Sequence, residues 1–134
     1  MSTCYFVDTS IWIDYFRNPA CATRDFIKAL VEEDRVYING IVIAEMLTGA
    51  KTPKELDLMY SAFRGLRFLE MGSSIFYKSG QHGFTLKRLG ITVPLSDLII
   101  ATHCLEHEIV LIASDRHFDV IAEHLPLKQH DKRR

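Results

Sequence analysis

The run Ile109-Val110-Leu111-Ile112-Ala113 constrains the fold more than any other stretch of this chain. Five consecutive apolar residues, rich in branched side chains, suit a strand that is covered on both faces, as strands of parallel sheets are. The other apolar segments alternate between strand-like and helix-like periods. The sequence therefore predicts an α/β domain with a short, mainly parallel sheet between layers of helices.

Other elements follow from the same periodicities. We expect short strands at residues 4–7, 36–38 and 67–69, and a last edge strand at residues 125–127. Helices are expected at residues 10–17, 22–33, 41–47, 53–63, 74–89, 97–106 and 116–123. Thr52 and Glu55 form a capping box with proline at the first helical position, and Gly90 suits a helix end.

The chain of 134 residues is long enough for one domain with a single core. We assign residues 1–127 to this domain and expect the basic tail, residues 128–134, to fray. A net charge of −1 argues against a generally basic nucleic-acid binder but permits a local basic rim around an acidic site.

Cysteine usage and hydropathy favour a cytoplasmic protein. The three cysteines, Cys4, Cys21 and Cys104, are odd in number and form no CxxC pair, which argues against a disulfide framework or a thiolate zinc site. No apolar run reaches membrane-spanning length, and the first residues do not form a signal peptide.

Acidic residues follow two of the predicted strands. Asp8 comes directly after the first strand and Asp115 after the clearest one, so both should lie at the carboxyl edge of the sheet, where ligands collect in such folds. Asp97 lies in the first turn of a predicted helix, and Glu45 is the single acid of an otherwise apolar helix. Each acid alone also fits a helix cap, a turn or an ion pair.

Together, the four acids favour a metal site. Carboxylates that share a small pocket repel one another, and a divalent cation removes that penalty. Oxygen ligands without clustered cysteine or histidine favour magnesium or manganese over zinc. Such ions bind phosphate oxygens, so the expected chemistry is metal-assisted hydrolysis of a phosphodiester.

Four blocks in this order resemble a known family: FVDTSIWIDYF, IVIAEMLTGA, LSDLIIA and VLIASDRHFD. The chain is similar to the PIN-domain ribonucleases and, within them, to VapC-type toxins of toxin–antitoxin pairs. The resemblance covers nearly the whole chain. It implies a three-layer α/β/α sandwich and Mg²⁺- or Mn²⁺-dependent endonucleolytic cleavage of RNA.

The resemblance also implies roles for individual residues. The acidic quartet that would bind the metal and carry catalysis is Asp8, Glu45, Asp97 and Asp115. The hydroxyls of Ser10 and Ser114 would support this quartet. Arg116 is placed to meet a phosphate, and an exposed ion pair fits it equally well. Two further acids, Asp14 and Asp119, favour structural or surface roles.

Partners are implied in the same way. The family acts on tRNA or ribosomal RNA, commonly forms homodimers, and is inhibited by a small antitoxin. Because the antitoxin binds operator DNA, contact with DNA would be only indirect, and no membrane is involved. Aromatic residues of two predicted helices, Trp12, Tyr15, Phe16, Tyr60 and Phe63, fit either core packing or such an interface.

Two other functions compete with the nuclease. His103 and His107 match the H-x-x-E-H pattern of a zinc hydrolase, although little chain remains for a third ligand, and surface positions late in a helix fit them better. The chain could also be a catalytically weak PIN-like module that binds RNA or a partner.

Overall fold

The computed structural model describes residues 2–18, 20 and 22–130 and contains a four-stranded parallel sheet. The strands are β1 (Tyr5–Val7), β2 (Val36–Ile38), β3 (Arg67–Phe68) and β4 (Val110–Ile112), in the order β3-β2-β1-β4. All three pairings are parallel, with Tyr5 opposite both Val36 and Val110. The predicted parallel sheet is therefore confirmed.

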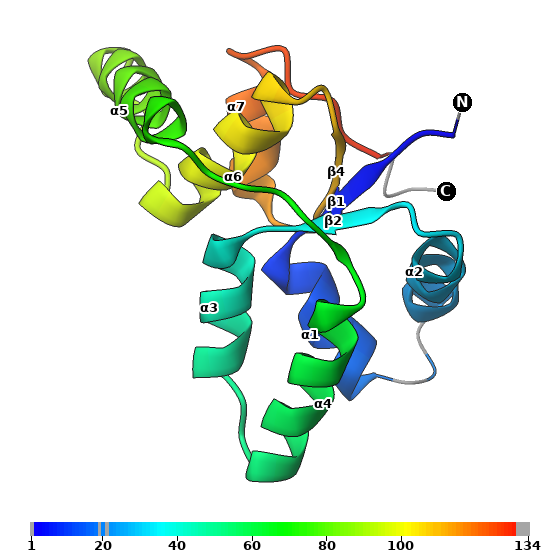
Figure 1. The fold of residues 1–134 in the computed structure, drawn as a ribbon. Helices are drawn as coiled ribbons and strands as arrows, with labels where there is room; N and C mark the ends of the chain where they lie inside the picture. Colours follow the sequence, from blue (N-terminus) through cyan, green and yellow to red (C-terminus); the bar gives the residue numbers. More distant parts are fainter. Residues whose placement is uncertain (1, 19, 21, 131–134) are drawn as a thin grey trace.

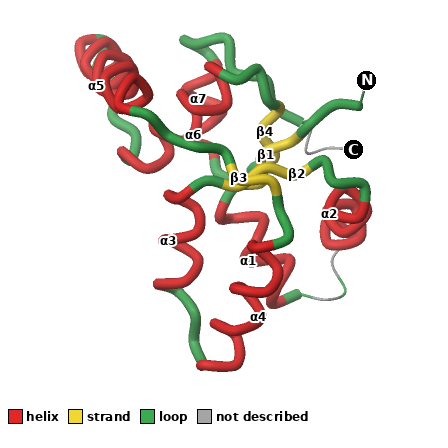
Figure 2. The backbone as a smooth tube through the Cα atoms, in the orientation of Figure 1, coloured by secondary structure: helices red, strands yellow, loops and turns green. Residues whose placement is uncertain are grey.

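Helices cover both faces of this sheet (Figures 1 and 2). The group formed by α1 (Thr9–Arg17), α2 (Ala22–Glu32), α3 (Gly40–Thr48) and α4 (Pro53–Arg64) lies on one side. The group formed by α5 (Ser73–Arg88), α6 (Leu95–Glu106) and α7 (Arg116–Ala122) lies on the other. This arrangement is the expected three-layer α/β/α sandwich.

Helix α6 contributes a continuous run of buried residues to the core. Seven consecutive residues of α6, from Leu98 to Cys104, are buried because this helix packs against β4 and between α5 and α7. A helix that is buried on all sides is apolar around its whole circumference, which explains the weak amphipathic pattern of this segment. Helix α6 therefore holds the strand ends and the helix start at Asp97 in fixed relative positions.

Local capping follows the sequence closely. The Thr52 side chain accepts a hydrogen bond from the Glu55 amide at the start of α4, as the capping box predicts. Gly90 follows the end of α5 with φ +80°, a left-handed conformation that glycine adopts at little cost.

The predicted edge strand at residues 125–127 is wrong. Pro126 has no amide hydrogen for a sheet ladder, and the chain joins the sheet later, where Gln129 forms a parallel bridge with Leu111. The Leu111 amide donates to the Lys128 carbonyl at 2.9 Å, and the His130 amide donates to the Leu111 carbonyl at 2.8 Å. The first three residues of the expected tail thus line the sheet, and residues 131–134 lie outside the described residues.

The aromatic residues divide between core and surface. Trp12 and Phe63 are buried, so the core interpretation holds for them, whereas Tyr60 is 44% exposed. Within residues 2–18, 20 and 22–130, every helix is too short or too polar to cross a lipid bilayer.

Candidate metal centre

Asp8 is a buried carboxylate at the carboxyl end of β1. Its backbone amide donates to the Ile112 carbonyl of β4 at 2.9 Å, which joins the two strand ends. The side chain is 4% exposed and begins α1, where Oδ2 accepts hydrogen bonds from the Ser10 amide at 3.3 Å and the Ser10 hydroxyl at 3.0 Å. Burial raises the pKa of Asp8 to about 6, against the opposing effect of these hydrogen bonds.

Asp97 and Asp115 meet around an imidazole. Asp97 lies in the first turn of α6, and Asp115 begins α7 after β4. The Nδ1 atom of His117 lies 2.8 Å from Asp97 Oδ2 and 2.9 Å from Asp115 Oδ1. Burial raises the pKa of Asp97, the hydrogen bond from His117 opposes that rise, and the charge of Asp115 adds to it.

Glu45 joins the group from the other helical layer. It lies on α3, and its Oε1 accepts a hydrogen bond from the Thr9 hydroxyl of α1 at 3.0 Å. The negative charge of Glu45 raises the pKa of Asp97, and the charge of Asp97 raises that of Asp8. The structure therefore brings the four acids into one electrostatically connected group, while their role in metal binding stays a prediction.

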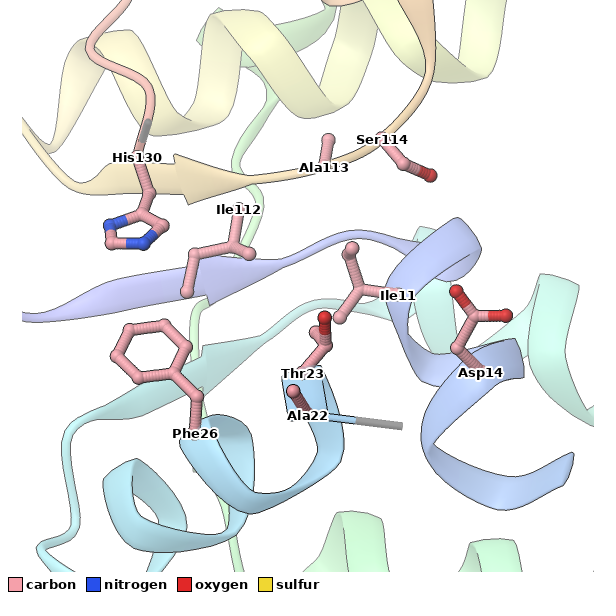
Figure 3. A pocket seen from close by; sticks show the side chains of 9 residues that line it. All are labelled: Ile11, Asp14, Ala22, Thr23, Phe26, Ile112, Ala113, Ser114 and His130. Carbon is pink, nitrogen blue, oxygen red and sulfur yellow. The ribbon is translucent and has the colours of Figure 1, made fainter. Parts of the chain in front are cut away.

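The two predicted supporting serines contribute in different ways. The Ser10 hydroxyl donates to Asp8 and also accepts a hydrogen bond from the Ser114 amide at 3.3 Å. Ser114 thus acts through its main chain, while its side chain lines a neighbouring pocket (Figure 3). Together they tie the carboxylate after β1 to the turn after β4.

Of the remaining predicted residues, Arg116 begins α7 and is exposed. The described part of the chain offers it no ion pair, so its guanidinium is available to a phosphate. Asp119 is exposed and accepts a hydrogen bond from the Gln129 side chain at 3.3 Å, which places it beside the C-terminal segment.

The zinc site built on His103 and His107 is contradicted. His103 is fully buried rather than at the surface. Its Nδ1 lies 2.9 Å from the Asn39 amide nitrogen, and its Nε2 lies 2.9 Å from the Glu70 carbonyl oxygen. Because the Asn39 oxygen accepts from the Val42 amide, Nδ1 accepts and Nε2–H donates. Both ring nitrogens are occupied, and neither can bind a metal.

His117 was missed by the sequence analysis. The only available signal was its position two residues after Asp115, at the start of a helix. A single histidine there is easily assigned to the surface, and its side chain is in fact 43% exposed. Only the packing of α6 against α7 brings it to Asp97.

A divalent cation fits the resulting donor set. Ligand atoms of Asp97, Asp115 and His117 all lie within 4.8 Å of one another. Two ligands at right angles around a cation, with bonds of about 2.1 Å, are about 3 Å apart. The separations of 2.8 and 2.9 Å between the imidazole and the two carboxylates are close to this value. A bound cation would also lower the energetic cost of burying the negatively charged Asp8 near Asp97.

Comparison with known proteins gives a consistent result. Residues 5–124 match the family model described as PIN domain. The chain is 27% identical over 120 residues to VapC ribonuclease Mb1587 of Mycobacterium bovis, covering 87% of this chain and 90% of that protein. It is 27% identical over 115 residues to ribonuclease VapC1 of Haemophilus influenzae, covering 81% and 84%.

The fold is also similar to a solved structure. DNA-bound VapBC from Salmonella typhimurium superimposes with a TM-score of 0.79 at 21% identity, covering 97% of this chain and 98% of the other. At this identity, the similarity supports the fold alone, and the chemistry has to be argued from the residues of the site.

Proposed function

Because the chain belongs to the PIN-domain family, we propose that it is a divalent-metal-dependent endoribonuclease and the toxin of a type II toxin–antitoxin pair. The observation that carries this proposal is the convergence of Asp97 and Asp115 on His117 within 4.8 Å, beside the buried Asp8 that follows β1. The charge of Glu45 on α3 raises the pKa of Asp97, and the charge of Asp97 raises that of Asp8. The similarity to proteins named VapC ribonuclease supports RNA as the substrate.

Mg²⁺ or Mn²⁺ is the proposed cofactor. The residues that would hold it are Asp8, Glu45, Asp97 and Asp115, together with His117. Such an ion would neutralise charge on the phosphodiester and activate a water molecule for attack.

The protein's own groups position this centre. The Ser10 hydroxyl and amide fix the rotamer of Asp8, and the Thr9 hydroxyl of α1 holds the Glu45 carboxylate of α3 by a hydrogen bond. At Asp8, the donated hydrogen bonds oppose the rise in pKa that burial causes. Arg116, exposed at the start of α7, would bind a phosphate of the RNA backbone.

A cleavage assay with matched variants tests the proposal. RNA cleavage by the purified protein with Mg²⁺ or Mn²⁺ should stop when EDTA is added. Asp97→Asn should lower the rate by about two orders of magnitude, as loss of a key electrostatic group does in other enzymes. Asp57→Asn makes the same chemical change at an exposed position of α4 and should leave the cleavage rate unchanged. Cleavage that persists in EDTA, or equally in both variants, contradicts the proposed mechanism.

The catalytically weak alternative gives a different result. In that case the wild-type protein would bind RNA or a partner yet leave RNA intact with either metal. The burial of Asp8, which costs stability without a cation, argues for an active site.

We propose that a small antitoxin binds in the groove between α3 and α4. This groove has a volume of about 290 Å³ and an apolar lining that includes Leu47, Tyr60 and Phe68. Contact with DNA would then be indirect, through the antitoxin. Mixing the two proteins and measuring RNA cleavage tests this assignment, because a bound antitoxin should suppress it and Tyr60→Ala should weaken the suppression.

We also propose a homodimer through α5. Phe76, Tyr77 and Phe84 of this helix are 47%, 77% and 65% exposed, and Leu95 nearby is 66% exposed. Large apolar side chains gathered on one surface are typical of interfaces. Light scattering should give a dimer that Tyr77→Asp together with Phe84→Asp converts to a monomer.

The proposed substrates are tRNA or ribosomal RNA, and the proposed location is the cytoplasm. Cys4 and Cys104 are free thiols, which a reducing compartment preserves. Sequencing of cleavage ends in total RNA would identify the substrate.

A further inference from the structure

A pocket of about 500 Å³ lies beside the acidic centre, between α1, α2 and the end of β4 (Figure 3). Asp14 and Ser114 lie at one end of the pocket, and Phe26 and His130 lie at the other. The proposed cleavage chemistry does not use this pocket. Its complete lining is Ile11, Asp14, Ala22, Thr23, Phe26, Ile112, Ala113, Ser114 and His130.

The pocket is coupled directly to the carboxylate at the end of β1. Ser114 lines the pocket, and its amide donates to the Ser10 hydroxyl, which in turn donates to Asp8. Only two hydrogen bonds therefore separate the pocket wall from the proposed metal ligand. An RNA whose phosphate lies at the acidic centre would have a neighbouring nucleotide at this opening.

The walls combine apolar surface with a few polar groups. Ile11 and Ile112 form apolar surface between the two ends, and the Phe26 ring stacks on His130 with centroids 4.9 Å apart. Asp14 and Thr23 add a carboxylate and a hydroxyl. A flat heterocycle with apolar faces and a polar edge matches such walls, and single-stranded RNA is recognised through bases of this kind.

Asp14 is the polar group without an assigned role. Its backbone carbonyl accepts from the Asn18 amide, but its exposed side chain forms no hydrogen bond or ion pair with any residue the structure describes. The carboxylate is therefore available as a pair of acceptors at the pocket.

Building on the proposed nuclease function, we propose that this pocket binds the base next to the cleaved phosphate and that Asp14 selects guanine. Guanine is the base whose Watson–Crick edge presents two adjacent N–H donors to a carboxylate. Adenine and cytosine place a ring nitrogen acceptor beside their amino group, and uracil flanks its single N–H with two carbonyls. An acceptor that faces a carboxylate is repelled, so the other three bases are disfavoured.

The first test measures binding without cleavage. The probes are 5′-GMP and 5′-IMP, which differ only in the amino group that would bind Asp14. In two-dimensional amide NMR spectra, 5′-GMP should shift the signals of Thr23 and Ser114, and its affinity should exceed that of 5′-IMP about tenfold, the value of one charge-assisted hydrogen bond.

Matched variants give this test its control. Asp14→Asn should remove the preference for 5′-GMP over 5′-IMP. Asp25→Asn makes the same chemical change at an exposed position of α2 that does not line the pocket, and it should preserve the preference. Equal affinity for the two nucleotides in the wild type, shifts outside the pocket, or no shift at about 5 mM nucleotide would overturn the proposal.

The second test maps cleavage sites in a library of RNAs with randomised loops. The wild type should cut mainly where guanine flanks the cleaved bond, and Asp14→Asn should spread cleavage over all four bases. Cleavage by the wild type without a base preference overturns the pocket assignment but keeps the nuclease. Absence of any cleavage overturns the nuclease, and the nucleotide titration then decides the pocket separately.

Discussion

The ends of β1 and β2 place two buried polar residues in equivalent positions with opposite consequences. Asp8 follows β1 and begins α1, and Asn39 follows β2 and begins α3. They are 4% and 0% exposed, and each caps its helix through a side-chain oxygen. The backbone environment is thus nearly the same, and the difference lies in the side chain and its partners.

At β2 the polar atoms form a closed, neutral network. The Asn39 oxygen accepts from the Val42 amide, while its nitrogen donates to His103, which donates onward to the Glu70 carbonyl. Burial lowers the pKa of His103 and so favours its neutral form. Every buried group has a partner, and the network serves stability.

At β1 the buried group is an acid surrounded by other acids. Within the described residues Asp8 has no basic side chain as an ion-pair partner, and its pKa is raised to about 6 by burial. The same position in the fold therefore carries an unfavourable charge that a bound cation would compensate. Under the proposed function, Asp8 lowers the stability of the metal-free protein and would be compensated by the bound cation.

The largest expected effect is on RNA cleavage and comes from Asp8→Asn, which gives the end of β1 the same residue type as the end of β2. Asp8→Asn retains a cap for α1, because asparagine caps helices as well as aspartate does. It removes a carboxylate from the metal centre, and RNA cleavage should fall by about two to three orders of magnitude. Initial rates with Mg²⁺ and Mn²⁺ check this. A variant that keeps more than a tenth of the wild-type rate contradicts the role proposed for Asp8.

The next largest effect is a loss of stability when the hydrogen bonds between Asn39, His103 and Glu70 are broken. His103→Ala leaves the Asn39 amide and the Glu70 carbonyl without partners and creates a cavity, so the free energy of unfolding should fall by about 3 kcal/mol. Urea denaturation measures this loss. The matched change His107→Ala, at an exposed ring on the same helix end, should cost about 0.5 kcal/mol or less. Equal costs would show that the network contributes nothing.

These two strand ends also show what the sequence could predict. An acid directly after a continuous apolar run indicates a ligand at the sheet edge, because parallel strands bring their carboxyl ends together. That rule predicted that Asp8 and Asp115 lie at the same edge of the sheet. Glu45 stood out as the single charge on an apolar helix. The alternation of strand and helix periods was enough for the three-layer fold.

What the sequence could not predict depended on packing between distant segments. His103 was assigned to the surface because a histidine late in a helix usually lies there, yet α6 is buried from Leu98 to Cys104. The nearly continuous apolar run before His103 was a signal of burial that the H-x-x-E-H pattern obscured. Likewise, no local pattern reveals that Gln129 pairs with Leu111 or that His117 meets Asp97.

A smaller effect should appear in the pH dependence of stability without metal. The folded-state pKa of Asp8, about 6, exceeds its ordinary value of 3.8, so folding favours the protonated acid. The stability from this group is complete below about pH 4 and is lost as pH rises through 6, and the full loss amounts to at most about 3 kcal/mol. Asp8→Asn should therefore unfold at a higher temperature than the wild type at pH 8 in EDTA, and at a similar temperature at pH 4.

At β2 the buried His103 should change stability with pH in the opposite direction, which allows a comparison with Asp8. Burial lowers the pKa of His103, so its contribution is present above its ordinary pKa of 6.5 and is lost as pH falls through its lowered folded-state pKa. Asp97 shifts in the same direction as Asp8, and the difference between wild type and Asp8→Asn isolates the single group. A difference that does not change with pH contradicts the raised pKa. Saturating Mn²⁺ at pH 8 should reverse the difference, because only the wild type keeps the full ligand set.

The smallest expected effect is on metal preference and comes from replacing His117, the second histidine to be compared. His103 uses both ring nitrogens within the protein, whereas His117 directs Nδ1 to two carboxylates of the proposed metal centre. Imidazole suits manganese better than magnesium, which prefers oxygen ligands. His117→Asn replaces this nitrogen donor with an amide, so the preference for Mn²⁺ over Mg²⁺ should fall about fivefold. Electron paramagnetic resonance of free Mn²⁺ during Mg²⁺ competition measures it, with exposed His124→Asn as the control. If His117 serves only as an ion-pair partner of Asp97 and Asp115, its loss should change the affinity for both metals equally, and an unchanged ratio would exclude it as a ligand.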